Sequence, residues 1–302
     1  MSKLIYPPPL NRGDKVVIIS PSGNTESLYI DTAKDVLEKW GLQVQIASYA
    51  YQKYGRYGGT IQQRLDDLQS SMDDKEIKSI FCSRGGYGVV QLLEHLDYDG
   101  IRKHPKWLVG YSDISALHSA FLKNSIVSLH APMARHLTEH NDDEASGYLR
   151  NVLFSGSMNY KVKSHPFNRS GEIKGRLFGG NLAVMCGLIG IPYLKIPPRG
   201  ILFIEDIGEP PYKIDRMMWQ LKLSGILKKI SGLIVGQFSE CEEDPLMGKT
   251  IYESIRDIVS EYDYPVVFNF PVGHVQNNYP LIHGGRALLS IKNDFVIIEN
   301  ID

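Results

Sequence analysis

The chain has 302 residues, which is enough for about two domains. Apolar residues make up 43% and charged residues 22%, a composition typical of a soluble globular protein. The net charge is −1 and no long block of Lys or Arg is present, which argues against a nucleic-acid or anionic-membrane surface.

The cysteines and the N-terminus bear on the compartment. Cys82, Cys186 and Cys241 are far apart, with no C-x-x-C pair and no metal-ligand spacing. A sparse, odd number of cysteines fits a reducing environment. The first ten residues lack the apolar core of a signal peptide, and no run approaches the roughly 18 apolar residues of a membrane span. We therefore expect a cytoplasmic protein without a metal site.

The first 125 residues alternate between two kinds of apolar pattern. Short runs rich in β-branched residues predict strands at 15–20, 44–47, 79–82 and 107–109. Helical spacing predicts helices at 28–40, 60–72, 89–96 and 114–123. This alternation is typical of a parallel sheet with helices on both faces, in which ligands bind at the carboxyl ends of the strands.

The second half predicts a separate domain. A weak helix at 142–157 is followed by a polar stretch with proline and glycine at 164–171, which predicts a linker between domains at 1–160 and 168–302. Further strands are expected at 200–206, 231–237 and 265–270, helices at 181–194, 215–227 and 251–262, and a terminal hairpin at 286–299.

Ser112 is the first candidate for chemistry. It lies in G-Y-S-D at 110–113, between a predicted strand and a predicted helix, where backbone N–H groups and the helix dipole favour developing negative charge. A serine there can be a strained, exposed nucleophile. The structural alternative is that Ser112 and Asp113 only cap the helix. The G-x-S-x-G motif is incomplete, because Ile114 replaces the second glycine.

Glu205 lies at the end of the strand predicted at 200–206, and His274 follows the strand predicted at 265–270. A carboxylate such as Glu205 is costly to bury unless it is paired, and its structural alternative is an ion pair with Lys213 or Arg216. A histidine can shuttle protons near neutral pH, although a structural role is an equal alternative. The chain order of serine, acid and histidine is that of α/β-hydrolases.

Two other histidines compete for the role of base. His283 lies close to His274 in the sequence and is a rival. His118 is on the helix after Ser112, but it is more than a turn away and is expected to pack or to be exposed.

Several motifs together resemble the LD-carboxypeptidase family of serine peptidases. The motifs are R-G-G-Y-G at 84–88, G-Y-S-D at 110–113, G-G-N-L at 179–182, E-D-I-G-E-P-P-Y-K-I-D-R at 205–216 and G-H at 273–274. The match spans nearly the whole chain and is closer to the muramoyl-tetrapeptide carboxypeptidase branch than to the microcin-immunity branch. The family usually has Leu-Pro where this chain has Leu281-Ile282, a departure that affects the loop's expected shape.

This resemblance implies a fold and a set of roles. The implied fold is α/β with two domains, an N-terminal flavodoxin-like parallel sheet with helices and a C-terminal β-rich α/β domain. Ser112 matches the nucleophile, Glu205 the acid, His274 the base, and Gly86 and Asp113 the oxyanion-hole donors. The implied activity is removal of the terminal D-alanine from a murein tetrapeptide during cytoplasmic peptidoglycan recycling, by a homodimer without a cofactor.

Such an enzyme must also hold the substrate's free carboxylate. Arg84 and Arg176 lie near glycine-rich turns and are candidates, although either could be a structural ion-pair partner. Three other functions stay open: a microcin-immunity-type carboxypeptidase acting on peptidyl-adenylates, an α/β-hydrolase-like esterase, and a non-catalytic binding module. The incomplete G-x-S-x-G motif counts against the esterase.

Overall fold

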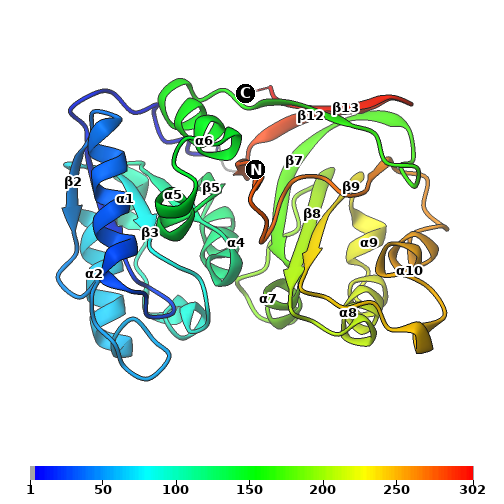
Figure 1. The fold of residues 1–302 in the computed structure, drawn as a ribbon, viewed down its shortest axis with the longest axis horizontal. Coiled ribbons are helices and arrows are strands. Elements are labelled where there is room, and N and C mark those ends of the chain that lie inside the picture. The colour runs from blue at the N-terminus through cyan, green and yellow to red at the C-terminus, as the bar shows by residue number, and fades with distance from the viewer. Residues whose placement is uncertain (1–3, 302) are drawn as a thin grey trace. The chain divides into compact units, whose positions relative to one another are not determined.

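A computed structural model describes residues 4–301 and divides into two compact units. Unit 1 contains the chain up to Ser157 together with Tyr279–Gly284, and unit 2 contains Met158–Asn278 and the chain from Gly285 onward. Figure 1 follows the chain through each unit in colour. The sequence-based ranges 1–160 and 168–302 did not anticipate that residues 279–284 return to the first unit.

Unit 1 is built on a six-stranded sheet in the order β11-β5-β4-β3-β1-β2. The strands are β1 (Lys15–Ile19), β2 (Gln43–Ile46), β3 (Ile77–Cys82), β4 (Trp107–Gly110), β5 (Ser128–His130) and β11 (Leu281–His283). The first five are parallel and β11 pairs antiparallel with β5. The parallel order 2-1-3-4-5 is that of flavodoxin-like folds, so the expected fold of this unit is confirmed.

Six α-helices flank this sheet. They are α1 (Ser27–Lys39), α2 (Ile61–Asp73), α3 (Asp99–Lys103), α4 (Ser115–Lys123), α5 (Ala134–Glu139) and α6 (Glu144–Ser155). Thr60 begins α2 with a capping box, because its side chain and that of Gln63 each accept a backbone N–H of the other. α1 packs against α5 (Figure 1).

Unit 2 is built on a seven-stranded sheet in the order β10-β9-β8-β7-β12-β13-β6. The strands are β6 (Asn159–Lys163), β7 (Gly171–Asn181), β8 (Gly200–Ile207), β9 (Gly232–Ser239), β10 (Val266–Val267), β12 (Arg286–Ile291) and β13 (Phe295–Asn300). β7 to β10 are parallel, and β12, β13 and β6 continue the sheet antiparallel. The helices are α7 (Leu182–Gly187), α8 (Pro211–Leu223), α9 (Ile226–Lys229) and α10 (Ile251–Ile258).

The structure confirms the terminal hairpin and corrects several boundaries. The helix expected at 89–96 is two 3₁₀ turns, Val89–Gln91 and Leu93–His95. The helix expected at 215–227 begins at Pro211, because proline at the first helical position lacks only an N–H that would have no partner there. Strands β5, β6, β7 and β11 were not predicted. β5, β6 and β11 are runs of three to five residues that give too little periodicity, whereas the sequence analysis placed a linker and a helix around Gly171–Asn181, which forms β7.

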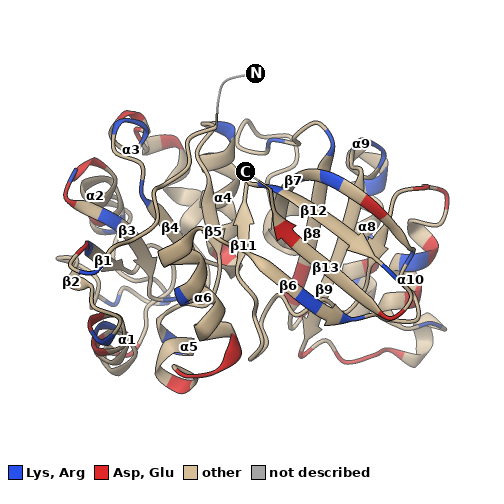
Figure 2. Cartoon of the chain, turned by 90° about the horizontal axis from the view of Figure 1, so that it is seen from above, with Lys and Arg blue, Asp and Glu red and all other residues tan. Residues whose placement is uncertain are grey.

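Charged residues are interspersed rather than grouped by sign. Figure 2 shows Lys and Arg next to Asp and Glu on the helices of both units. Among the helices within residues 4–301, none is both long enough and apolar enough to cross a bilayer.

Candidate active site

Ser112 occupies a strained backbone position at the carboxyl end of β4. The four residues of β4 are buried, and the chain then turns into a 3₁₀ segment, Ser112–Ile114, that leads into α4. Ser112 has φ of 66°, in the left-handed region that residues other than glycine rarely adopt. Strain of this kind costs about 1–3 kcal/mol and is concentrated at functional sites. The residue that turns the chain is therefore the serine itself and not Gly110.

A glycine loop approaches this serine closely. A Cβ atom added to Gly85 would lie 2.6 Å from Ser112 Cβ and 2.8 Å from Ser112 Oγ, so only glycine fits there. Gly86 follows with φ of 120°, again in a region suited to glycine. The R-G-G-Y-G motif thus brings backbone groups, not a phosphate site, next to Ser112.

The helix-capping alternative for Ser112 and Asp113 is wrong. Neither side chain caps the 3₁₀ segment or α4. The Asp113 carboxylate instead accepts hydrogen bonds from the Ser22 hydroxyl at 2.5 Å and from the Val89 N–H at 2.9 Å. Burial raises the pKa of Asp113, and these two bonds together with the charge of Arg64 oppose that rise.

In unit 2, Glu205 and His274 form a hydrogen-bonded pair. His274 Nδ1 lies 2.7 Å from Glu205 Oε2, with the carboxylate fully buried and the imidazole 14% exposed. The alternative ion pairs of Glu205 are not formed, since Lys213 pairs with Glu209 and the Arg216 guanidinium lies over the Tyr212 ring.

Local backbone features hold this pair in register. The β8–β9 pairing is irregular between Ile204 and Asp206, a bulge that can re-aim the Glu205 side chain. Gly273 has φ of 126°, and a Cβ added there would lie 2.9 Å from Glu205 Cβ. The Gly273 N–H donates to Asn278 Oδ1 at 3.0 Å, which fixes the turn before His274. Asn278 was not predicted, because its role depends on a turn that the sequence does not reveal.

The surroundings of His274 favour the imidazolium. Burial alone would lower the pKa of His274, but the charge and hydrogen bond of Glu205, aided by the charges of Asp206 and Glu240, raise it above the ordinary value. A carboxylate at Nδ1 favours the tautomer whose proton is on Nδ1, so that Nε2 is the basic nitrogen.

Asp206 forms a second carboxylate site beside Glu205 that sequence reasoning did not assign. Asn181 Nδ2 donates to Asp206 Oδ1 at 2.8 Å, and the Ala183 N–H donates to Oδ2 at 2.9 Å. Burial and the neighbouring charge of Glu205 raise the pKa of Asp206 to about 6. Asn181 also accepts the Val184 N–H as the cap of α7. The G-G-N-L motif at 179–182, which contains Asn181, is the sequence feature that could have pointed to this site.

The structure argues against both rival histidines as the base. His118 and His283 are buried in unit 1 and stack on each other with ring centroids 5.5 Å apart. His118 lies 2.8 Å from both the Ser128 hydroxyl and the Gly110 carbonyl. Burial lowers the pKa of His118 to about 4 and that of His283 well below the ordinary value. His283 belongs to β11, and His118, on α4, packs against it and against β4 and β5.

The two arginine candidates differ in position. Arg84 is exposed, directly precedes Gly85, and donates from Nη1 to the Asn24 carbonyl at 2.9 Å. Arg176 lies beside Gly200 at the start of β8, five residues before the partners Asn181 and Glu205. At about 3.3 Å per residue, this is roughly 16 Å along the strand. Arg84 is therefore the better placed of the two.

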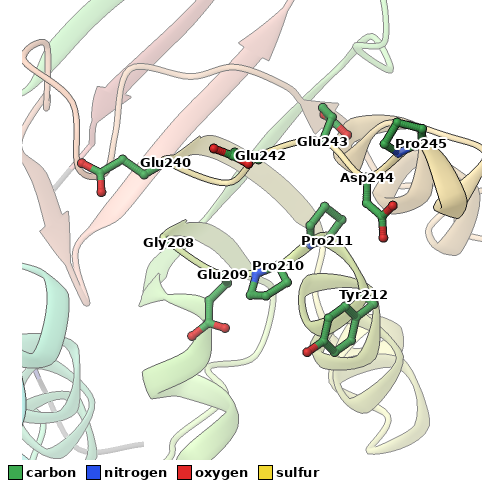
Figure 3. A pocket seen from close by; sticks show the side chains of 10 residues that line it. All are labelled: Gly208, Glu209, Pro210, Pro211, Tyr212, Glu240, Glu242, Glu243, Asp244 and Pro245. Atoms are coloured by element: carbon green, nitrogen blue, oxygen red, sulfur yellow. The ribbon is translucent and has the colours of Figure 1, made fainter.

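A cavity of about 440 Å³ in unit 2 is lined by acidic side chains but contains neither Glu205 nor His274. Figure 3 shows its residues on two facing segments, with carboxylates that do not converge on one point. One segment is the turn after β8 and the start of α8, with Gly208, Glu209, Pro210, Pro211 and Tyr212, and the other is the stretch after β9, with Glu240, Glu242, Glu243, Asp244 and Pro245. Within residues 4–301, no group of three or more His, Cys, Asp or Glu side chains could hold a metal ion.

The predicted site residues therefore fall into two groups, one in each unit. Ser112, Gly86 and Asp113 belong to the nucleophile half in unit 1, with Arg84 beside them. Glu205 and His274 form the acid–base half in unit 2.

Both units match domain models of one known protein family. Residues 16–131 match the description of the LD-carboxypeptidase N-terminal domain, and residues 174–289 match that of the LD-carboxypeptidase C-terminal domain. The chain is 31% identical to the murein tetrapeptide carboxypeptidase of Pseudomonas aeruginosa, over 91% of this chain and 92% of that protein. It is 32% identical to a Bacillus subtilis protein named "Probable murein peptide carboxypeptidase", over 97% and 94% of the two chains.

Solved structures of related proteins have a fold similar to that of this chain. The crystal structure of muramoyltetrapeptide carboxypeptidase from Oxalobacter formigenes matches with a TM-score of 0.88 and 30% identity, over 95% of this chain and 99% of that one. The microcin C7 self-immunity protein MccF of Escherichia coli is 26% identical over 80% of this chain and 79% of that protein. A structure of MccF with glutamyl sulfamoyl guanosine has a TM-score of 0.87 at 22% identity, over 97% of this chain and 98% of that one, a likeness of fold alone.

Proposed function

The chain belongs to the LD-carboxypeptidase family and is a serine carboxypeptidase, and on that premise we propose that it removes the terminal D-alanine from murein tetrapeptides. The names of the Pseudomonas and Oxalobacter relatives support this substrate. The observation that carries the proposed mechanism is the 2.7 Å hydrogen bond between His274 Nδ1 and the buried Glu205 carboxylate. This bond prepares a base for a strained serine.

In the proposed reaction, His274 Nε2 takes the Ser112 hydroxyl proton as Ser112 Oγ attacks the scissile carbonyl carbon. Glu205 holds the imidazole tautomer and stabilises the imidazolium. The N–H groups of Gly86 and Asp113 bind the oxyanion, and removal of one such donor typically costs roughly 10²–10³ in rate. The intermediate collapses, His274 protonates the leaving amine of D-alanine, and water then hydrolyses the acyl-enzyme by the same steps.

The substrate's free carboxylate is assigned to Arg84. Arg84 is exposed, adjoins the glycine loop at Ser112, and uses one guanidinium nitrogen on a backbone carbonyl. A guanidinium can still offer other N–H donors to a carboxylate. Arg176 is retained as a second candidate only for a group that extends along β7 and β8.

The setting of the reaction is part of the same proposal. Murein tetrapeptides are products of peptidoglycan breakdown, so we assign the enzyme to cytoplasmic recycling of these fragments. We also propose a homodimer, which light scattering of the purified protein would test. The partner implied is a small muropeptide, with no nucleic acid, membrane or cofactor taking part.

Mass spectrometry tests the proposed function directly. We would incubate the protein with L-Ala-γ-D-Glu-meso-diaminopimelate-D-Ala and run Ser112→Ala beside it. The parent should release D-alanine and Ser112→Ala should release none above background. Release by both proteins would refute Ser112 as the nucleophile, and release by neither folded protein would refute the substrate.

The relationship to MccF supports one alternative. MccF is 26% identical over most of the chain, and one of its solved structures holds glutamyl sulfamoyl guanosine. The alternative substrate is therefore a peptidyl or aminoacyl adenylate, cleaved by the same serine, histidine and glutamate. Hydrolysis of a stable aminoacyl sulfamoyl adenosine at a higher kcat/KM than that of the tetrapeptide would favour it.

A further inference from the structure

A buried polar network lies beneath the nucleophile turn of unit 1. The Asp113 side chain is 5% exposed, and one of its oxygens, Oδ2, accepts both the Ser22 hydroxyl and the Val89 N–H. Ser22 follows β1, Val89 ends the glycine loop after β3, and Asp113 follows β4. A single carboxylate oxygen therefore joins the ends of three parallel strands.

Arg64 holds the same loops from α2. Its side chain is 1% exposed, and Nη1 donates to the carbonyls of Pro21 at 3.0 Å and Gly88 at 2.9 Å. Its guanidinium also lies 5.0 Å from the centroid of the Tyr57 ring. Arg64 and Asp113 thus bind the loop after β1 to the loop after β3 at two separate points.

These contacts determine where Gly86 lies. The Gly23 N–H donates to the Gly85 carbonyl at 3.0 Å. A Cβ added to Gly86 would lie 3.2 Å from Gly23 Cα and 3.7 Å from Ser22 Oγ, so Gly86 rests directly on the loop after β1. A shift of that loop would move the Gly86 N–H relative to Ser112.

We infer that Ser22 and the Asp113 carboxylate are positioning residues for the oxyanion hole, an inference that rests on the proposed function. Asp113 then serves twice: its N–H binds the oxyanion, and its side chain, through Ser22, fixes the loop that carries the other donor. The physical reason is that an oxyanion hole works by preorganisation, and a misplacement of about 1 Å can cost roughly 10²-fold in rate.

The competing explanation is that these are only stabilising buried hydrogen bonds, and Ser20 provides the matched control. Ser20 lies at the same end of β1 and is 3% exposed. Its hydroxyl donates to the Ala50 carbonyl at 2.6 Å and lies 2.7 Å from the Ser83 hydroxyl. Ser20→Ala and Ser22→Ala therefore each remove one buried hydroxyl, but only Ser22→Ala removes a hydrogen bond to the Asp113 carboxylate.

The experiment compares these two variants by three measurements: kcat and KM on the tetrapeptide, the rate at which a fluorophosphonate labels Ser112 by intact mass, and the melting temperature. Both variants should melt lower by similar amounts. Ser22→Ala should lose about 10²-fold in kcat and in labelling rate, with KM within about threefold. Ser20→Ala should keep both rates within about threefold of the parent. Equal rates in the two variants would overturn the inference.

Two substitutions of Asp113 decide the matter if Ser22→Ala does not fold. Asp113→Asn can present its amide oxygen to Ser22 and Val89, so its labelling rate should stay within about tenfold of the parent. Asp113→Ala removes the acceptor and should lose about 10²-fold. A folded Asp113→Ala with the parent's labelling rate would overturn the inference. Failure of the folded parent to release D-alanine would instead refute the proposed substrate, and the labelling rates would still test the inference in that case.

Discussion

The two halves of the site are held by different means. In unit 1 the backbone positions Ser112, the proposed nucleophile, through its left-handed φ of 66° and a glycine loop too close to admit a Cβ. In unit 2 a fully buried carboxylate 2.7 Å away positions His274, the proposed base, by its charge. The first arrangement leaves no room for a Cβ at Gly85, and the second depends on the negative charge of Glu205.

This contrast determines which substitutions damage each half. An added methyl group should be severe around Ser112, where packing sets the geometry. An isosteric loss of charge should be severe at Glu205, where the surrounding space is unchanged but the imidazole loses its orienting partner.

The largest effect is expected for Glu205→Gln. The amide keeps the shape but favours the wrong imidazole tautomer and removes the charge that stabilises the imidazolium, so kcat should fall by about 10⁴-fold. Steady-state kinetics of D-alanine release measure it. Glu209→Gln is the control, because the Glu209 carboxylate lies 3.4 Å from Lys213 Nζ and is not bonded to His274. Its kcat should stay within about twofold of the parent's. A folded Glu205→Gln within tenfold of the parent would remove Glu205 from the mechanism.

Gly85→Ala tests the packed half by adding one methyl group. Its Cβ would meet Ser112 Cβ at 2.6 Å, so either the serine or the glycine loop must shift, and kcat should fall by about 10²-fold. Fluorophosphonate labelling should slow in parallel. Gly147→Ala is the matched control, because a Cβ there meets no atom within 4 Å, and that helical substitution should stabilise the protein by about 0.5–1 kcal/mol. Parent-like labelling of Gly85→Ala would contradict the steric account.

The contrast also explains what the sequence could predict. The parallel sheet of unit 1 follows from alternating β and helical patterns, and the position of Ser112 just after β4 follows from the rule about where α/β sheets carry their sites. The strain expected at Ser112 is present in its φ. These features depend on local periodicity and on residue type, which a sequence displays directly.

Other features depend on contacts between distant segments. Strand β11 pairs with β5 although about 150 residues separate them, and three apolar or half-polar residues give no periodicity that would reveal it. The partners of Asp113, namely Ser22 and Val89, lie 91 and 24 residues away. Asn181 and Asp206, which are also hydrogen-bonded, lie 25 residues apart. Sequence reasoning named candidate site residues but not the groups that hold them.

The histidines extend the comparison to acid stability. His118 is buried without a carboxylate partner, and burial lowers its pKa from 6.5 to about 4. Between these values the unfolded chain binds more protons than the folded protein, so stability is lost as pH falls below about 6.5 and the loss levels off below about 4. For His118 alone the loss at pH 5 is about 2 kcal/mol. His283, with a pKa also lowered by burial, adds to it.

Chemical denaturation at pH 7.5 and pH 5.0 measures this loss, and His118→Gln sharpens it. The variant should be less stable at pH 7.5, because it disturbs the contacts to Ser128 and Gly110, yet lose less stability between the two pH values. His104→Gln, at an exposed histidine, should leave the difference unchanged. An unaltered pH dependence in folded His118→Gln would exclude His118 as its source.

The smallest effect is expected at the edge of the charged half, where Glu240 acts on His274 only through space. The pKa of His274 is raised, so activity that requires its neutral form should rise with pH through a midpoint above 6.5 in kcat/KM. Glu240→Gln removes one of the charges that raise the pKa of His274 and should lower that midpoint by less than one pH unit. The shift should shrink in 0.5 M salt, because the Debye length there is only a few ångströms. Glu242→Gln, on the same loop, is the matched control and should leave the midpoint in place. A midpoint that neither variant moves would mean that Glu205 and Asp206 alone raise the pKa of His274. The charged half would then depend on neighbouring groups only, as the packed half does.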